Sequence, residues 1–494
     1  MNYRPTIGLE IHAELKTKTK MFCSCKNDPL EKRPNTNICP ICLGHPGTLP
    51  VANKEAIYKV LRFGAAIGAK LADESRFDRK NYFYPDLPKG YQISQYQYPL
   101  VKEGVLELPF SKLKVRITRA HLEEDAARNA HEKGVTLVDY GRAGIPLMEL
   151  VTEPDMRAAG EAREFAEELQ LIMRYLGVSD ADMELGLMRV EANISIAQLG
   201  GETAKLGTKV EVKNINSFRA VERAIDFEIK RQTEVLESGE KVKQETRGWN
   251  DVNQKTVSQR SKEEAHDYRY FPEPDLPPMR LSEVSDFQPE ILKAKLPELP
   301  SAKRTRFSKE FGLSGEKLEI LIRDRQWANY FEESVSEAKA DNDKINTEKI
   351  IELCANYIIS DLRGTAVSKT MPFNDVRAKV SPENFGDLMR LILQGGLSSR
   401  GAKDTLEIMV RTGEEPLEVA AREGYMISTD NNYIEMIVDG VIATNEKAVR
   451  DFKSGKEASM QFLVGQGMRE AKSKKIGADP EVLRKLFLVK IGDK

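Results

Sequence analysis

The stretch TIGLEIHAEL, from Thr6 to Leu15, alternates apolar and polar residues with a period of two. Successive side chains of a β-strand point to opposite faces, so the apolar set of this stretch faces a hydrophobic core. The other face then carries Glu10, His12 and Glu14 side by side, and a carboxylate and an imidazole on one strand can share a cation. A surface strand whose polar residues face water has the same pattern.

Later stretches repeat this alternation, and their second faces carry Glu, His, Arg, Lys and Asn in mixed charge. These stretches are Lys112 to Thr118, Met188 to Ile196 and Thr208 to Lys213. Helical periodicity at 53–68, at 155–176 and from about 217 supplies the apolar cover for the first face. We therefore expect an α+β fold whose antiparallel sheet has one open, charged side.

A sheet face that combines carboxylates for a metal with cations for phosphate fits nucleotide chemistry. The chain contains no GxxxxGK[ST] phosphate loop, and no GxGxxG follows a strand-like stretch. Any nucleotide site must therefore be built from side chains of the sheet.

The composition sets limits on the class of protein. A chain of 494 residues is expected to form two or three domains. Charged residues make up 31% of the chain, but the net charge is only −2, so any basic surface must be local. Neither an apolar signal core nor a membrane-length apolar run occurs, which predicts a soluble cytoplasmic protein without a membrane partner.

Five cysteines in a chain of this length do not form a disulfide scaffold, but four of them are paired. Cys23 and Cys25 form a CxC pair, and Cys39 and Cys42 form a CxxC pair. Two close thiol pairs on separate turns predict a closed, structural zinc site at 23–42, with unliganded thiols as the alternative. Cys354 lies in a helical segment and is expected to be a small core residue.

The segment from Phe77 to Gln97 mixes cations with aromatic residues, prolines and a glycine. Arg79 and Lys80 could hold phosphates while the tyrosines stack on a base. A long surface loop pinned by its own aromatic side chains has the same composition.

Two further segments carry acids in informative places. RAHLEED gathers Arg119, His121, Glu123, Glu124 and Asp125 at or near a strand end, although three consecutive acids are usually a solvated turn. In the mostly apolar run from 137 to 150, Glu149 must be either buried with a partner or directed into a site.

Beyond about Ser301 the chain is predicted to be nearly all helical, after an irregular edge at 244–278 that ends in a proline cluster. The last 44 residues carry ten Lys/Arg and six acids, with Lys472, Lys474 and Lys475 in one turn. A basic helical tail suits an RNA backbone, and a solvated charged surface is the alternative.

Several long motifs in one order resemble the GatB/GatE family of tRNA-dependent amidotransferase subunits. They are IGLEIHAEL, FDRKNYFYPD, RAHLEEDA, LVDYGRAGIPLMELVTEPD and DYRYFPEPD. The resemblance implies a catalytic domain at 1–292 like glutamine synthetase and guanido kinases, a helical domain at 293–407 and a YqeY-like tail at 408–494.

The same resemblance implies a carbon–nitrogen ligase of protein biosynthesis. Such a protein uses ATP to phosphorylate the side-chain carboxylate of mischarged Glu-tRNA(Gln) or Asp-tRNA(Asn). Ammonia, released from glutamine by a GatA-type amidase subunit, then displaces the phosphate, and a small GatC-type subunit completes a heterotrimer. The sequence does not distinguish the two tRNA substrates.

Site residues follow from the resemblance only where a motif matches. Catalytic residues fall on Glu10, His12, Glu123, Glu124 and Glu149, and the Mg²⁺ ligands among them are taken as Glu10, His12, Glu124 and Glu149. Imidazole is unusual for Mg²⁺, so His12 is expected to hold Mn²⁺ or to bind through water. Candidate phosphate partners are Arg79, Lys80, Arg119 and Lys213. Glu191 stands where many members have Asp, which puts a metal role there in doubt.

Two other hypotheses for these residues remain open. One is a non-catalytic RNA-binding scaffold that relies on the zinc knuckle and the basic tail. The other is a two-metal phosphoesterase that uses the same acids.

Overall fold

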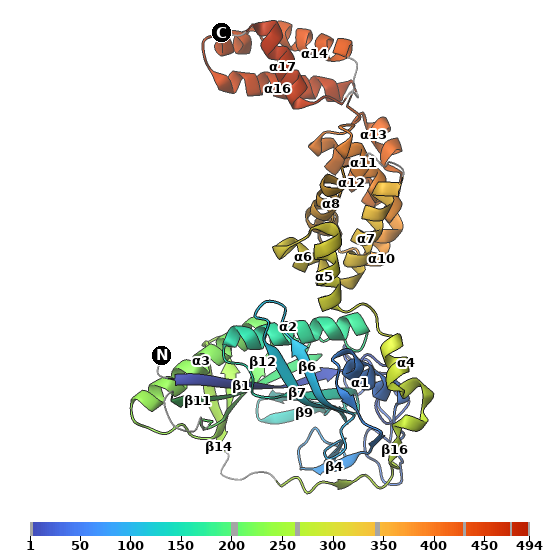
Figure 1. Ribbon diagram of the computed structural model, residues 1–494, viewed down its shortest axis with the longest axis vertical. Coiled ribbons are helices and arrows are strands. Elements are labelled where there is room, and N and C mark those ends of the chain that lie inside the picture. The colour runs from blue at the N-terminus through green and yellow to red at the C-terminus, as the bar shows by residue number, and fades with distance from the viewer. Residues whose placement is uncertain are drawn as a thin grey trace. The chain divides into compact units, whose positions relative to one another are not determined.

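The computed structural model describes residues 3–198, 206–261, 267–340, 346–427, 431–474 and 477–492. The chain divides into two compact units, Met1–Ser301 and Ala302–Lys494 (Figure 1). Within the described residues, no helix has both the length and the apolar character needed to cross a bilayer.

The first unit is built on a nine-stranded sheet in the order β14-β13-β12-β11-β1-β10-β7-β6-β2. Neighbouring strands run antiparallel except β12 and β13, which run parallel. The bounds are β1 Tyr3–Glu14, β2 Lys70–Leu71, β6 Val101–Glu107, β7 Lys114–Glu124, β10 Pro146–Thr152, β11 Met188–Gln198, β12 Val210–Ile215, β13 Glu245–Asn250 and β14 Lys255–Ser261. The strand predicted from TIGLEIHAEL is the middle strand of this sheet.

Three helices cover the apolar face of the sheet: α1 Lys54–Ala66, α2 Ala159–Leu176 and α3 Phe218–Glu237 (Figure 1). Ile7, Leu9 and Ile11 on β1 are at most 1% exposed beneath them. The side chain of Asn53 caps α1 by accepting hydrogen bonds from the backbone of the first turn, and Gly177 ends α2 in the left-handed conformation. The predicted mixed fold with a largely antiparallel sheet is confirmed.

Smaller sheets and short helices complete the first unit. Their bounds are β3 Glu74–Ser75, β4 Asp78–Asn81, β5 Tyr91–Ser94, β8 Arg128–Glu132, β9 Val135–Asp139, β15 Phe271–Pro272, β16 Met279–Arg280, η1 Leu281–Glu283, η2 Ser285–Phe287 and α4 Pro289–Ala294. The segment at 244–278, predicted to be irregular, instead supplies the edge strand β14 and its neighbour β13. Trp249 and Thr256, 6% and 3% exposed, anchor these two strands on the core side.

Apart from isolated bridges, all regular secondary structure among the described residues of the second unit is helical, as predicted. The helices are α5 Pro300–Phe311, which begins just before this unit, α6 Gly315–Ile322, α7 Arg325–Ala340, α8 Thr347–Asn356, η3 Tyr357–Leu362, α9 Arg363–Ser368, α10 Phe373–Lys379, α11 Pro382–Leu393, α12 Ser399–Thr412, α13 Pro416–Glu423, α14 Asn431–Thr444, α15 Glu446–Lys453, α16 Glu457–Ser473 and α17 Pro480–Ile491. Helices α14, α16 and α17 share a buried apolar cluster.

Two details of this unit bear on the sequence predictions. Cys354 in α8 is fully buried, as expected for a core residue. Lys472 and Lys474 are exposed at the end of α16, whereas Lys475 and Lys494 lie outside the described residues. The predicted domain boundaries at 292/293 and 407/408 fall within α4 and α12, and they stay predictions.

Candidate active site

The polar face of the main sheet is assembled by strand register. On β1, His12 lies opposite Glu149 of β10 on one side and Arg189 of β11 on the other. Glu149 in turn lies opposite His121 of β7. Directly opposed residues of antiparallel strands point to the same face, so side chains from four strands gather on one surface.

Two groups of metal-liganding side chains meet at Glu149. Ligand atoms of Glu10, His12 and Glu149 all lie within 4.8 Å of one another, and so do those of His121, Glu123 and Glu149. The Oε2 atom of Glu149 is 3.5 Å from Nε2 of each histidine. The Nε2 atom of His12 is also 3.8 Å from Glu123 Oε1. Carboxylates and imidazoles in this arrangement fit Mn²⁺ or Mg²⁺.

The charges within these groups depend on each other. Burial alone would raise the pKa of Glu149, but the charge of His121 and the hydrogen bond from His12 hold that pKa well below its ordinary value. Burial likewise opposes protonation of His12, yet the contacts with Glu149 and the charge of Glu123 raise its pKa to about 9. Protonated His12 therefore balances Glu149 in the metal-free protein, and a divalent cation would replace that proton.

A third group of acids adjoins the first. Ligand atoms of Glu10, Glu191 and Glu211 also lie within 4.8 Å of one another. Lys213 Nζ is 2.7 Å from Glu191 Oε2 and 3.7 Å from Glu211 Oε1, so a cation is already present there. Burial and the charge of Glu149 raise the pKa of Glu10. The geometry thus brings Glu191 beside Glu10, although its metal role was doubted from sequence.

Glu124 departs from the expected cluster. It follows Glu123 on β7 and points to the other side of the strand. There Lys89 Nζ donates to its Oε2 at 2.7 Å, and the backbone N–H of Ile93 donates to its Oε1 at 2.9 Å. Within the described part of the chain, Glu124 joins no metal-liganding group. Glu123 occupies the position expected for Glu124 beside Glu149.

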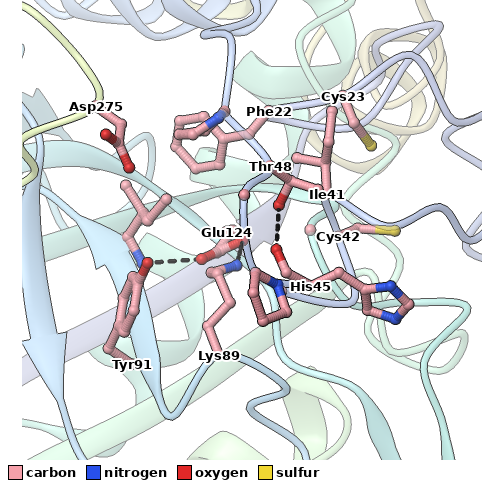
Figure 2. A pocket seen from close by; sticks show the side chains of 16 residues that line it. Phe22, Cys23, Ile41, Cys42, His45, Thr48, Lys89, Tyr91, Glu124 and Asp275 are labelled. Carbon is pink, nitrogen blue, oxygen red and sulfur yellow. Dashed lines mark hydrogen bonds and ion pairs between the residues drawn. The ribbon is translucent and has the colours of Figure 1, made fainter.

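Glu124 instead lines a cavity of about 230 Å³. Figure 2 shows Lys89 and Glu124 on one side of this cavity and the sulfur atoms of Cys23 and Cys42 on the other. His45 and Asp275 also contribute to its lining.

The candidate phosphate partners are placed differently from one another. Arg79 donates to both oxygens of buried Glu273, at 2.7 and 2.8 Å, and its guanidinium is used within the protein. Lys80 lies over the rings of Tyr82 and Tyr268. Burial disfavours its charge, but Glu123, Tyr270 and Glu149 raise its pKa overall. Arg119 Nη2 lies 3.5 Å from Glu149 Oε1.

A carboxyl pair with two arginines borders the polar face. Burial and the neighbouring Asp125 raise the pKa of Glu14 to about 8. Burial opposes the charge of Asp125, but Arg189 and Arg142 lower its pKa to about 2. Arg189 Nη2 donates to Asp125 Oδ1 at 3.0 Å. The sequence predictions assigned no role to Asp125, Arg189, His121 or Glu211. The strand alternation places Arg189 and Glu211 on the polar face, whereas His121 reaches that face only because the register of β7 shifts.

The four paired cysteines converge as their spacing predicts. The sulfur atoms of Cys23, Cys25, Cys39 and Cys42 lie within 4.8 Å of one another, and none forms a disulfide. Contact with the Cys23 thiol and the backbone N–H of Cys39 lowers the pKa of Cys42 to about 5, despite burial. A thiolate among four convergent sulfur atoms fits tetrahedral Zn²⁺.

Comparison with known proteins agrees with this architecture. The family model described as the GatB/GatE catalytic domain matches residues 5–285, and the GatB domain model that carries the YqeY name matches 330–491. The chain is 45% identical to the B subunit of the aspartyl/glutamyl-tRNA(Asn/Gln) amidotransferase of Thermotoga maritima, over 99% of this chain and 98% of the relative.

Relatives with the same name in other bacteria agree. The Brevibacillus brevis protein is 43% identical and the Dehalococcoides mccartyi protein 44% identical, each over 98% of both chains. The chain therefore belongs to the GatB family, the B subunits of aspartyl/glutamyl-tRNA(Asn/Gln) amidotransferases.

Proposed function

We propose that this protein amidates the amino acid of mischarged Glu-tRNA(Gln), Asp-tRNA(Asn) or both. The side-chain carboxylate attacks the γ-phosphate of ATP, which gives an acyl phosphate and ADP. Ammonia then displaces phosphate and leaves Gln-tRNA(Gln) or Asn-tRNA(Asn). The family names of the relatives support the tRNA substrates.

The observation that carries the proposal is the pair of ligand groups that meet at Glu149 on the polar face of the sheet. Attack of a carboxylate on a γ-phosphate brings negative charge to negative charge. Bound divalent cations neutralise that charge and bring the attacking and leaving oxygens into line. Glu10, His12 and Glu149 would hold one such cation, and His121 and Glu123 would hold another together with Glu149.

Fixed cations beside these groups supply further positive charge. Among the described residues, the ammonium of Lys80 contacts two tyrosine rings and has no ion-pair partner, so it is free to bind a phosphoryl oxygen. Arg119 lies beside Glu149, with its Nη2 atom 3.5 Å from Glu149 Oε1. Arg79 is a weaker candidate, because Glu273 already engages its guanidinium at both oxygens.

The remaining parts of the proposal concern the assembly. A GatA-type amidase subunit releases ammonia from glutamine, and a GatC-type subunit joins the two in a cytoplasmic heterotrimer. The sheet unit is related to the glutamine synthetase and guanido kinase fold, and the helical tail binds tRNA through its basic surface. The four cysteines hold a structural Zn²⁺, supported by their convergent sulfur atoms.

The test is ATP-dependent transamidation of both charged tRNAs by the complex reconstituted with its partner subunits. Glu149→Gln removes the ligand common to both groups, and we expect amidation to fall about 100-fold or more while tRNA binding persists. Glu107→Gln, at a half-exposed surface carboxylate of β6, is the matched control. Unchanged amidation by Glu149→Gln would contradict the proposal. Phosphatase activity of the isolated chain would instead favour a two-metal phosphoesterase.

A further inference from the structure

Arg189 is an arginine of the polar face that the proposed chemistry does not yet use. It lies on β11 directly opposite His12, and its side chain is 36% exposed. A guanidinium has five N–H donors. Among the described residues, Arg189 makes one hydrogen bond, from Nη2 to Asp125 Oδ1 at 3.0 Å. Its remaining donors are available on an accessible surface.

The other arginine beside Asp125 is occupied. Arg142 donates to the backbone carbonyls of Ala126 and Ala127, at 2.9 and 3.0 Å. Its Nε also lies 3.6 Å from Asp125 Oδ2. Arg142 therefore serves the local fold, and Arg189 presents the open guanidinium of this pair.

Arg189 is held from behind by a buried pair of carboxyl groups. Glu14 and Asp125 are 6% and 4% exposed and lie in hydrogen-bond contact with each other. Each retains one buried oxygen to which no described group donates. Arg189 Nη2 and Arg142 Nε lie 3.0 and 3.6 Å from the two oxygens of Asp125. Asp125 therefore fixes the Arg189 guanidinium on the strand position opposite His12.

Two of the neighbouring cations, Arg119 and Lys213, already lie against acids of the same face, and the third, Lys80, is assigned above to a phosphoryl oxygen. Arg119 lies 3.5 Å from Glu149 Oε1, and Lys213 contacts both Glu191 and Glu211. A negatively charged ligand that enters this face meets many carboxylates, so a partly exposed guanidinium with free donors next to the metal-liganding groups determines where the ligand's anionic group binds. The planar fork of arginine matches the two oxygens of a carboxylate.

We propose that Arg189 binds the side-chain carboxylate of the aminoacyl-tRNA and orients it for activation, with Asp125 as its positioning residue. This inference rests on the proposed function and names the substrate group that the open arginine recognises. A phosphate of the nucleotide offers the same paired oxygens, so the experiment separates the two sources.

The experiment uses the reconstituted complex with Arg189→Lys and Arg189→Met. We expect KM for the aminoacyl-tRNA to rise roughly tenfold or more, since hydrogen bonds between charged groups are lost, while KM for ATP changes little. Arg116→Met is the matched control, because Arg116 is an exposed arginine paired with Asp155 away from this cluster. A rise in KM for ATP alone would overturn the assignment in favour of a nucleotide phosphate.

A binding measurement provides a readout that does not depend on turnover. Stable amide-linked analogues of tRNA charged with glutamate and with glutamine differ only in a carboxylate against an amide. The parent complex is expected to prefer the glutamate form roughly tenfold, and the Arg189→Met complex to lose that preference while it still binds tRNA. Equal preference in parent and variant would refute the role of Arg189.

Failure of this inference differs from failure of the proposed function. A parent complex without ATP-dependent amidation would reject the proposed function itself. An active parent whose Arg189 variants keep both KM values would reject only the role of Arg189. Thermal unfolding of each variant confirms that it is folded, and Arg189→Lys keeps the test decisive if Arg189→Met does not fold.

Discussion

The buried carboxyl pair of Glu14 and Asp125 allows a quantitative prediction about stability. Burial and the nearby Asp125 raise the pKa of Glu14 from 4.5 to about 8, so Glu14 is protonated at neutral pH. Its proton supplies the donor that the pair otherwise lacks. The change Glu14→Gln replaces this acid by a neutral amide of nearly the same shape, which can donate to Asp125 at every pH.

The sign of the effect follows from the direction of the shift. The folded chain holds the Glu14 proton more tightly than the unfolded chain does. The stability that Glu14 contributes is therefore complete below pH 4.5 and is lost as the pH rises toward about 8. Within this window each pH unit lowers the free energy of unfolding by about 1.4 kcal/mol. Asp125 titrates below the window and His12 above it.

The glutamine variant has no such proton to lose. Between about pH 5.5 and 7.5 its free energy of unfolding should therefore gain about 2.7 kcal/mol relative to the parent. For a unit of this size that corresponds to roughly 5 °C in the midpoint of thermal unfolding. Differential scanning calorimetry of both proteins across this pH range measures the difference between their midpoints of thermal unfolding.

If the difference in thermal-unfolding midpoint between Glu14→Gln and the parent stays constant with pH, the conclusion that Glu14 is neutral is refuted. Glu107→Gln serves as the control, since its carboxylate is 53% exposed and should keep a constant gap to the parent.

Three further predictions follow from other parts of the structure. Lys89→Met removes the ammonium group that pairs with buried Glu124, and it should lower the free energy of unfolding by about 3 kcal/mol, measured by thermal unfolding. A loss below about 1 kcal/mol would contradict this. Metal analysis should find zinc in the parent and none in Cys39→Ser, and a parent free of zinc would refute the zinc site. Removal of the residues after about 410 should weaken tRNA binding roughly tenfold or more and leave the metal content of the sheet unit unchanged. Equal tRNA affinity of the truncated and full-length proteins would count against the tail as a tRNA-binding element.

The strand at 6–15 could be predicted because its signal is local. Alternation alone gives both the buried face and the polar face of β1, and the same pattern identifies β11 and β12. The helical caps at Asn53 and Gly177 are likewise determined by residues close in sequence. The four cysteines converge because their spacing already restricts them to neighbouring turns.

Glu123 and Glu124 illustrate what a local pattern leaves open. Adjacent glutamates face opposite sides of a strand, and only the register of β7 decides which one joins Glu149. A shift in that register falls between Arg119 and Ile117, where pairing with β10 skips Thr118. After this bulge, His121 and Glu123 share the polar face, whereas Leu122 and Glu124 do not. The motif HLEED alone cannot reveal that choice.

Contacts between residues far apart in the sequence account for the other differences between the predicted site and the structure. Arg79 is engaged by Glu273, which lies 194 residues further along the chain. The pairing of Glu14 with Asp125 likewise joins strands that only the folded sheet brings together. Such contacts decide which cations remain free for a ligand, so composition alone overestimates Arg79 and overlooks Arg189.

The shared position of Glu149 makes the two ligand groups a single linked system. In the proposed metal sites Glu149 would serve both groups, so an ion bound in one group would alter the affinity of the other. A titration with divalent ions should then follow a coupled isotherm and not the sum of two independent ones. No substitution at Glu149 can silence one position alone. Separating them requires changes at residues that belong to only one group, such as His12 or His121.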